Sequence, residues 1–164
     1  KRARALRLSG QEADWVDRFV CPSGRALPLA QKKAFTSREI HCFFRDVGDV
    51  GVELSIMQLA QVAAKWGPEL PHDVWTVAIN RTVEVLEVYF HQYSEIIDPK
   101  PLVNGKELMN ALNIPPGPRV GLLLRIIVEA QVSGEVVTAK DAVALASHKA
   151  CDAGIMRKPD PRRA

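Results

Sequence analysis

The sequence of 164 residues lacks the features that mark secreted, metal-binding or membrane proteins. Its only cysteines, Cys21, Cys42 and Cys151, have neither the close spacing of a metal site nor the even number expected of a disulfide framework. This usage indicates a reducing compartment, and we expect the cytoplasm. No apolar run is long enough to cross a membrane, and the basic start at residues 1–4 is not followed by the apolar core of a signal peptide.

Aromatic residues and excess charge are also scarce. Aromatic residues are 6% of the chain while hydrophobic residues are 47%, so aliphatic side chains must form most of the core. The net charge of +3 permits an acidic partner without indicating one. The length suits one domain or two small helical lobes. Because the first residue is Lys1 rather than Met, we expect a piece of a longer or processed protein.

Helix-start and helix-stop signals divide the chain, and no segment has a convincing strand pattern. Capping boxes, in which a polar residue and a glutamate three positions later exchange backbone hydrogen bonds, predict helix starts at Ser9, Thr36 and Asn104. Apolar residues spaced by three and four then predict helices over residues 9–20, 36–47, 50–65, 71–97, 106–112, 118–133 and 138–146. We expect an all-α fold, an irregular bundle of about six or seven helices around one long central helix.

The longest predicted helix covers residues 71–97. It carries an apolar row spaced by three and four residues, made of Trp75, Ile79, Val83, Leu86, Phe90, Tyr93 and Ile97. At 1.5 Å per residue the helix would be about 40 Å long. We expect it to be the spine against which the other helices pack. In the helix over residues 50–65, we expect the inward side chains to be Val52, Ile56, Leu59, Ala60 and Ala63.

The helix predicted over residues 118–133 is apolar on almost every side, which predicts that it is buried. Its only polar stripe is Gly121, Arg125 and Glu129, spaced by four. Gly117 and Gly121 leave backbone uncovered beside Arg119, and a helix start with a nearby arginine suits an anion such as phosphate. Alternatively, both glycines allow another helix to pack closely and Arg119 is solvated.

Three segments carry a family resemblance. They are Phe43–Val52 (FFRDVGDVGV), Tyr89-Phe90 with Ile97-Asp98-Pro99, and a third set made of Gly105–Met109 (GKELM), Pro116–Gly121 (PGPRVG), Glu129-Ala130 and Gly134–Val136. Together they cover about residues 36–146, and their joint spacing is more specific than any one motif. In this order they resemble the C-terminal region of the CCA-adding tRNA nucleotidyltransferase and bacterial poly(A) polymerase family.

The resemblance implies a division of labour. In this family a catalytic head precedes the helical region and uses Mg with ATP or CTP. The present sequence has no Asp-x-Asp pair to hold two metal ions and no phosphate-binding loop of the usual kind. The resemblance therefore implies that this chain is the non-catalytic C-terminal body and tail, which holds RNA, namely the tRNA 3′ region, while an absent head adds nucleotides. We expect no catalytic residue, metal ligand or cofactor in the chain itself.

The resemblance also implies three parts. Residues 1–98 would be a helical body segment following a His-Asp-type region, residues 99–150 an RNA-binding-like helical segment, and residues 151–164 a disordered basic tail. Helical RNA is held chiefly through its backbone and shape, so exposed basic side chains and uncovered backbone are the predicted contacts. These are Lys106, Gly117, Arg119, Gly121, Arg125 and Lys140. Arg125 has a structural alternative, an ion pair with Glu129 one turn on.

Two other functions remain open. A metal-dependent phosphohydrolase would use His72 and Asp73 together with His41 and Asp98. The structural alternative is that Asp73 interacts with the helix dipole in a first turn. Relatives with a His-Asp domain often have an aspartate where this chain has Gln61, which is a poor metal ligand. A helical interaction or dimerisation module would instead use the surface of the long helix.

Overall fold

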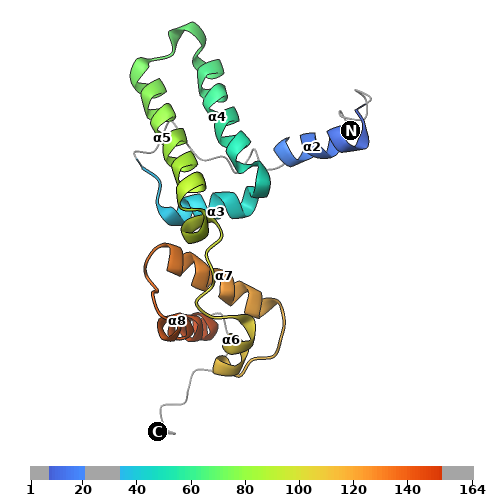
Figure 1. The fold of residues 1–164 in the computed structure, drawn as a ribbon, viewed down its shortest axis with the longest axis vertical. Helices are drawn as coiled ribbons and strands as arrows, with labels where there is room; N and C mark the ends of the chain where they lie inside the picture. Colours follow the sequence, from blue (N-terminus) through green and yellow to red (C-terminus); the bar gives the residue numbers. More distant parts are fainter. Residues whose placement is uncertain (1–7, 21–33, 153–164) are drawn as a thin grey trace. The chain divides into compact units, whose positions relative to one another are not determined.

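The computed structural model describes residues 8–20 and 34–152. Within these ranges the chain forms α-helices joined by short turns, as Figure 1 shows: α2 (Gly10–Val20), α3 (Ser37–Val47), α4 (Gly51–Trp66), α5 (His72–His91), α6 (Gly105–Leu112), α7 (Pro118–Val132) and α8 (Ala139–Asp152). The described residues contain no strand. The prediction of an all-α fold with six or seven helices is therefore confirmed.

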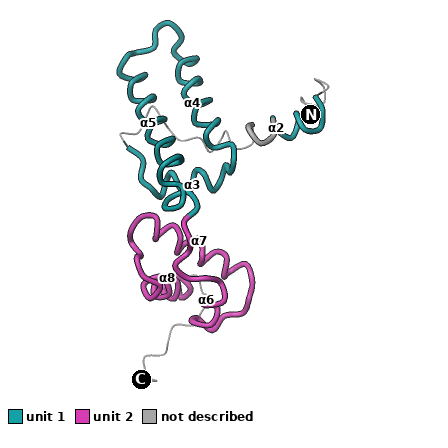
Figure 2. Tube along the Cα trace, in the orientation of Figure 1, with its two compact units in different colours: residues 1–98 teal, residues 99–164 magenta. Residues whose placement is uncertain are grey.

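The chain divides into two compact units, Lys1–Asp98 and Pro99–Ala164 (Figure 2). In unit 1, α4 and α5 lie side by side and are joined by the 3-10 turn η3 (Gly67–Glu69) (Figure 1). Beside them lie α3, the 3-10 turn η2 (Gly48–Val50) and the π turn η4 (Tyr93–Ile97). Their buried core is Phe35, Ile40, Phe43, Phe44, Val47, Val50, Leu54 and Val85.

The predicted capping boxes are formed. The backbone N–H of Thr36 donates to Glu39 Oε2 at 3.0 Å, and the backbone N–H of Glu39 donates to Thr36 Oγ1 at 3.3 Å. Ser9 with Glu12 and Asn104 with Glu107 repeat this exchange. Each box satisfies helix-start N–H groups that have no partner inside the helix. The bonds from the Ser9 backbone and then its hydroxyl lower the pKa of the Glu12 carboxyl.

The long helix is shorter than the sequence predicted. Although α5 is the longest described helix, it ends at His91 after 20 residues, because Gln92 leaves the helical region with φ −126° and ψ 26°. The next five residues form η4. The buried His41 places its Nδ1 2.7 Å from the carbonyl oxygen of Ile96, so α3 contacts this turn directly. A tertiary contact of this kind is invisible to helical periodicity.

The buried faces of α4 and α5 also differ from the prediction. The residues that are buried are Gly51, Leu54, Ser55 and Gln58 on α4, and Ala78, Thr82 and Val85 on α5. Several residues expected inside are exposed, namely Ile56 (53%), Val83 (45%), Phe90 (65%) and Tyr93 (46%). The small side chains on the observed faces let the two backbones approach, and the hydroxyls of Ser55 and Thr82 bond carbonyls of their own helices.

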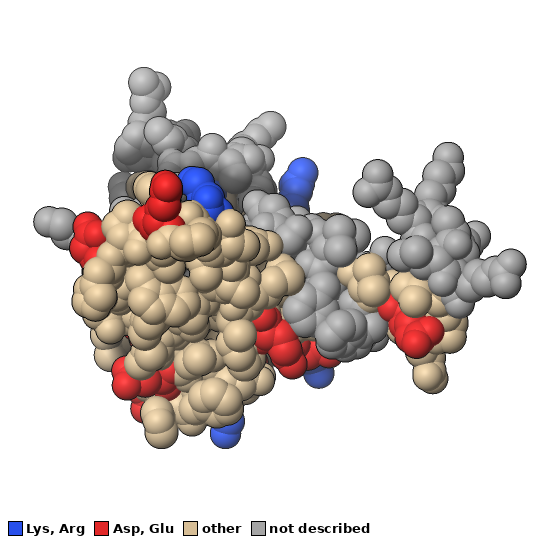
Figure 3. All heavy atoms as spheres, turned by 90° about the horizontal axis from the view of Figure 1, so that it is seen from above, with Lys and Arg blue, Asp and Glu red and all other residues tan. Residues whose placement is uncertain are grey.

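Residues other than Lys, Arg, Asp and Glu make up most of the described surface visible in Figure 3. Apolar side chains are not confined to the interior, since Trp66 at the end of α4 and Val77 in α5 are exposed. In the described part of the chain, no helix has the length and apolar character that crossing a membrane requires.

Unit 2 is a three-helix unit with a core of its own: Val103, Leu108, Leu112, Val120, Leu123, Ile127, Ala130, Val136, Ala142, Ala146 and Ala150. Three alanines of α8, Ala142, Ala146 and Ala150, are spaced by four residues and fully buried, which lets α7 and α8 pack closely. As predicted, α6 stops before Asn113, which adopts the left-handed conformation typical of a helix C-cap. The side chain of Gln131 binds the backbone of Lys100 and Leu102, tying the start of the unit to α7.

The expectation that the helix starting at Pro118 is buried on almost every side is wrong for the unit described. One face of α7 is buried through Val120, Leu123, Ile127 and Ala130. Leu122 remains 48% exposed, because only α6 and α8 pack against this helix within the unit.

Gly51→Ala should destabilise unit 1. A Cβ at Gly51 would lie 2.5 Å from two ring carbons of Phe44 and 3.1 Å from Val47 Cγ2, and the Phe44 ring is itself buried. We expect a loss of about 1–3 kcal/mol in the free energy of unfolding, measured by urea titration.

Gly121→Ala is the matched control, because it also adds one methyl group to a helical glycine but meets no atom within 4 Å. It should stabilise unit 2 by about 0.5–1 kcal/mol through lower chain entropy. Equal stability of Gly51→Ala and the wild type would contradict the close packing of Phe44.

Candidate nucleic-acid interface

The start of α7 has no side-chain cap. Gly117 is the N-cap residue, and Pro118 occupies the first helical position, where its missing N–H costs nothing. The backbone N–H of Val120 donates to the Gly117 carbonyl at 3.0 Å. This helix start has the partial positive charge of the helix dipole, and no side-chain oxygen neutralises it.

Neither glycine of this region is required by packing. A Cβ built at Gly117 or Gly121 meets no described atom within 4 Å. Gly117 has φ 163°, which is extended backbone that any residue adopts, and Gly121 lies inside a regular helix. The alternative that these glycines admit a closely packed helix is therefore wrong for the described structure. Their backbone is open to solvent.

The four predicted basic contacts are all exposed: Lys106, Arg119, Arg125 and Lys140. Exposed cations of this kind can approach a phosphate from solvent.

Five of the six predicted residues gather around the first half of α7. A Cβ at Gly105 would lie 3.9 Å from Val120 Cγ1 and 3.8 Å from Leu124 Cδ1, so the start of α6 packs against this part of α7. That packing brings Lys106, the second residue of α6, to the same region. We call the set the α7 cluster; it consists of Lys106, Gly117, Arg119, Gly121 and Arg125.

Lys140 lies apart from the α7 cluster. The N–H of Val136 donates to the carbonyl of Ala130 at 3.2 Å, which fixes the segment before α8 at the far end of α7. Eleven residues separate Arg119 from Ala130, or about 16 Å along the helix. A ligand that reaches both Lys140 and Arg119 must therefore span most of α7.

The α7 cluster is not one flat patch. At 3.6 residues per turn, Gly121 and Arg125 are about 40° apart around the helix axis and share a face. Arg119 lies about 160° from Gly121, on the other side of the axis but in the first turn of the helix. The predicted residues are all exposed, but they do not share one face of α7. Gly121 and Arg125 lie on one side of the helix, and Arg119 lies on the other side in the first turn.

The residues of the proposed phosphohydrolase are not assembled into a site. His72 and Asp73 begin α5, whereas Asp98 lies beyond its end, and 20 helical residues span about 30 Å. His41 is buried beside Ile96, near that far end. Across residues 8–20 and 34–152, no group of three or more His, Cys, Asp or Glu side chains is placed to hold a metal ion. This geometry contradicts the four-residue metal site.

The exposure of two aromatic residues was not predicted from the sequence. Phe90 and Tyr93 were assigned to the packed row of the long helix, yet both lie at the surface of unit 1. No local signal distinguishes them, because an aromatic residue spaced by three or four from other apolar residues is the usual pattern of a core position.

Comparison with known proteins relates part of the chain to a known family. Residues 75–146 match the model of tRNA nucleotidyltransferase domain 2. The A-adding tRNA nucleotidyltransferase of Deinococcus radiodurans is 38% identical over 93 residues, which are 55% of this chain and 20% of that protein. The CC-adding enzyme of Synechocystis is 28% identical over 111 residues, 68% of this chain and 24% of that protein. The CC-adding enzyme of Thermus thermophilus is 38% identical over 82 residues, 44% of this chain and 19% of that protein.

The chain thus spans a fifth to a quarter of the length of these curated relatives. No solved structure matches it significantly. The family model covers the region from α5 to most of α8, which includes every residue of the α7 cluster. Residues 75–146 therefore match tRNA nucleotidyltransferase domain 2, and the chain has partial similarity to A-adding and CC-adding tRNA nucleotidyltransferases.

Proposed function

We propose that this chain holds the 3′ region of tRNA while a catalytic head outside these residues adds nucleotides to it. The observation that carries the proposal is the uncovered helix backbone at Gly121, next to the exposed Arg125 and within a domain of the tRNA nucleotidyltransferase family. A phosphate can contact a helix at a glycine more closely than at any other residue, since no Cβ intervenes.

The net charge of the sequence over residues 99–164 supports this role, with four of its cations in residues 153–164, outside the described range. Residues 99–164 contain ten Lys and Arg and six Asp and Glu, a net charge of +4, whereas residues 1–98 contain twelve and thirteen, a net charge of −1. Lys106 and Arg119 each lie in the first turn of a helix, where the dipole adds to their positive charge. Together they suit the phosphate backbone of helical RNA, which is recognised by shape and charge rather than by sequence.

We propose that nucleotidyl transfer itself takes place in a head that holds Mg and ATP or CTP. Paired carboxylates are the usual ligands of such metal ions, and this sequence contains no Asp-x-Asp. The relatives are named as A-adding and CC-adding enzymes, so we propose nucleotide addition to tRNA for the parent protein. We also propose that it acts in the cytoplasm, in keeping with Cys42 and Cys151, which form no disulfide.

Replacing Lys106 and Arg119 together with glutamine should weaken binding of a tRNA transcript by about tenfold at moderate salt. Two lost phosphate contacts should also reduce the slope of log affinity against log salt by about 2. Both quantities can be measured by fluorescence anisotropy over a salt series.

The matched control is Lys65→Gln with Lys149→Gln, which removes two exposed cations outside the α7 cluster. It should change the salt slope by less than half as much. An identical salt slope for wild type and the Lys106/Arg119 variant would rule out phosphate contact at these residues.

A larger side chain at Gly121 should weaken tRNA binding without destabilising the fold. Gly121→Met places a flexible side chain where a phosphate would approach the helix, so tRNA affinity should fall about tenfold. The fold should be kept, because nothing lies within 4 Å of the added Cβ and Met favours helices.

Ala144→Met adds similar bulk at an exposed position of α8 and serves as the control. Its tRNA affinity should match that of wild type. If Gly121→Met binds tRNA as tightly as this control, the open backbone at Gly121 plays no part in holding RNA.

A further inference from the structure

The end of α5 presents aromatic rings to solvent. Phe90 is 65% exposed and Tyr93 46%, and Phe90 is the most exposed aromatic side chain among those the structure describes. Both belong to unit 1, whereas the α7 cluster belongs to unit 2. Exposed aromatic rings that are close neighbours are a common feature of binding surfaces.

The rings of Phe90 and Tyr93 pack against Tyr89. Tyr89 contacts Phe90 at 5.2 Å and Tyr93 at 5.3 Å between ring centroids, both edge to face. On its other side Tyr89 lies 5.0 Å from the buried ring of Phe44. Because the exposed rings are anchored to the core through Tyr89, they lose little conformational freedom when a ligand covers them.

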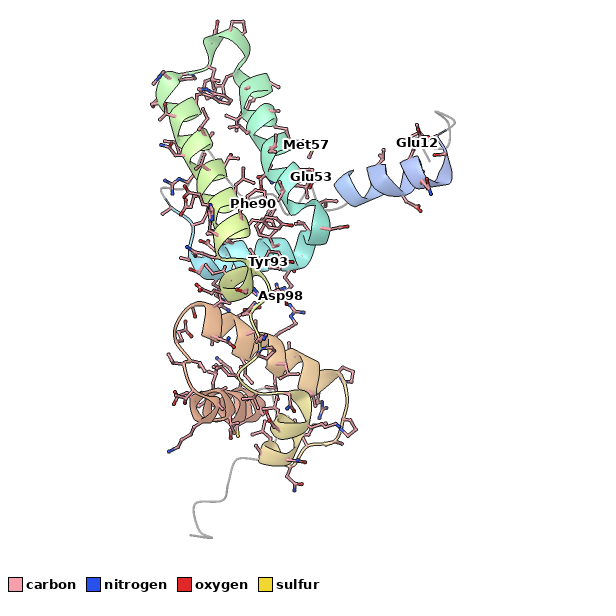
Figure 4. All side chains as sticks on the ribbon, viewed as in Figure 1. Glu12, Glu53, Met57, Phe90, Tyr93 and Asp98 are labelled. Carbon is pink, nitrogen blue, oxygen red and sulfur yellow. The ribbon has the colours of Figure 1, made fainter. Side chains whose placement is uncertain are left out.

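The segment that carries the rings is acidic. Residues 82–98 contain four carboxylates and no lysine or arginine. Glu84 is paired with Arg81, while Glu87, Glu95 and Asp98 are exposed. Glu87 lies one turn before Phe90 on the same helix face. Figure 4 labels Phe90, Tyr93 and Asp98, which follow one another along the chain at the end of unit 1.

Aromatic faces flanked by carboxylates favour a cation that is also planar. A guanidinium group stacks on a phenyl or phenol ring and donates paired hydrogen bonds to a carboxylate. A nucleic-acid base would stack on the same rings, but its phosphates would then lie close to Glu95 and Asp98, with the same charge. Charge complementarity therefore selects a basic polypeptide over RNA.

We propose that the surface formed by Phe90, Tyr93, Glu87, Glu95 and Asp98 binds an arginine-bearing segment of a partner protein. This surface belongs to unit 1 and contains aromatic and acidic residues, whereas the α7 cluster belongs to unit 2 and contains basic residues and glycines. Binding of such a partner does not require RNA binding. It would give unit 1 a function, since the proposed tRNA contact involves only residues of unit 2.

The test uses the full chain and a fluorescently labelled octa-arginine peptide. Phe90→Leu with Tyr93→Leu keeps apolar surface but removes both rings, and it should weaken peptide binding at least tenfold. Glu95→Gln with Asp98→Asn should weaken it to a similar extent and lower its salt dependence. Phe90→Tyr keeps a ring and should bind within twofold of wild type. Octa-lysine should bind several-fold more weakly than octa-arginine, because an ammonium group does not stack.

Two control variants test whether charge or exposed apolar area alone is responsible. Val83→Ala alters an exposed apolar residue of the same helix, and Glu135→Gln removes an exposed carboxylate of unit 2. Both should bind octa-arginine as wild type does, and circular dichroism should show the same helix content in every variant.

Three results would overturn the proposal. In the first, ring removal leaves octa-arginine binding unchanged, or octa-lysine binds equally well, so that only net charge matters. In the second, ring removal abolishes binding of an oligoadenylate while peptide binding is retained, which would make the rings a platform for bases. In the third, ring removal converts a dimer to a monomer in gel filtration with no effect on peptide binding, which would assign the surface to a second copy of the chain.

Discussion

The ring of Phe44 is the contact on which the geometry of unit 1 depends. It belongs to α3, packs against the Cβ-free surface of Gly51 at the start of α4, and stacks on Tyr89 of α5. One buried side chain thus fixes the mutual positions of three helices. Cores are packed to the density of organic crystals, so even one added methyl group at Gly51 has no space to occupy. The exposed rings of Phe90 and Tyr93 are positioned through the same contact.

Packing requires a glycine at Gly51 in unit 1 but not at Gly121 in unit 2. At Gly51 the absence of a side chain is required by the fold, because the Phe44 ring occupies the space that a Cβ would take. At Gly121 the surrounding space is empty, and the helix would be more stable with alanine. A glycine that costs stability and serves no packing role in its own unit is best explained by something outside it. This contrast supports contact with a ligand at α7, as proposed.

The two units also differ in the partners that their surfaces suit. Unit 2 is built on small residues in α8, and its exposed Lys106, Arg119 and Lys140 lie at helix starts, which is an arrangement suited to phosphate. Unit 1 has exposed carboxylates and anchored aromatic rings at the end of α5, which suit a cation. On these proposals one short chain would bind a polyanion with one unit and a basic polypeptide with the other.

The all-α class, the helix starts and the residue types of the candidate interface can be predicted from the sequence. These depend on local chemistry: Thr36 with Glu39 and Asn104 with Glu107 each close a capping box within four residues, and Asn113 ends α6 through its own backbone conformation. The exposure of Lys106 and Arg119 likewise follows from charge alone.

Which faces are buried and where α5 ends depend on contacts between helices and cannot be predicted from local sequence. Helices α4 and α5 are apolar on more than one side, so periodicity cannot choose between Leu54 and Ile56, or between Val85 and Phe90. The choice depends on small residues that allow close approach of the two helices, and the end of α5 is accompanied by a bond from His41, 55 positions earlier, to Ile96. Contacts between residues far apart in the sequence leave no local pattern, and they decide which side chains remain available to a partner.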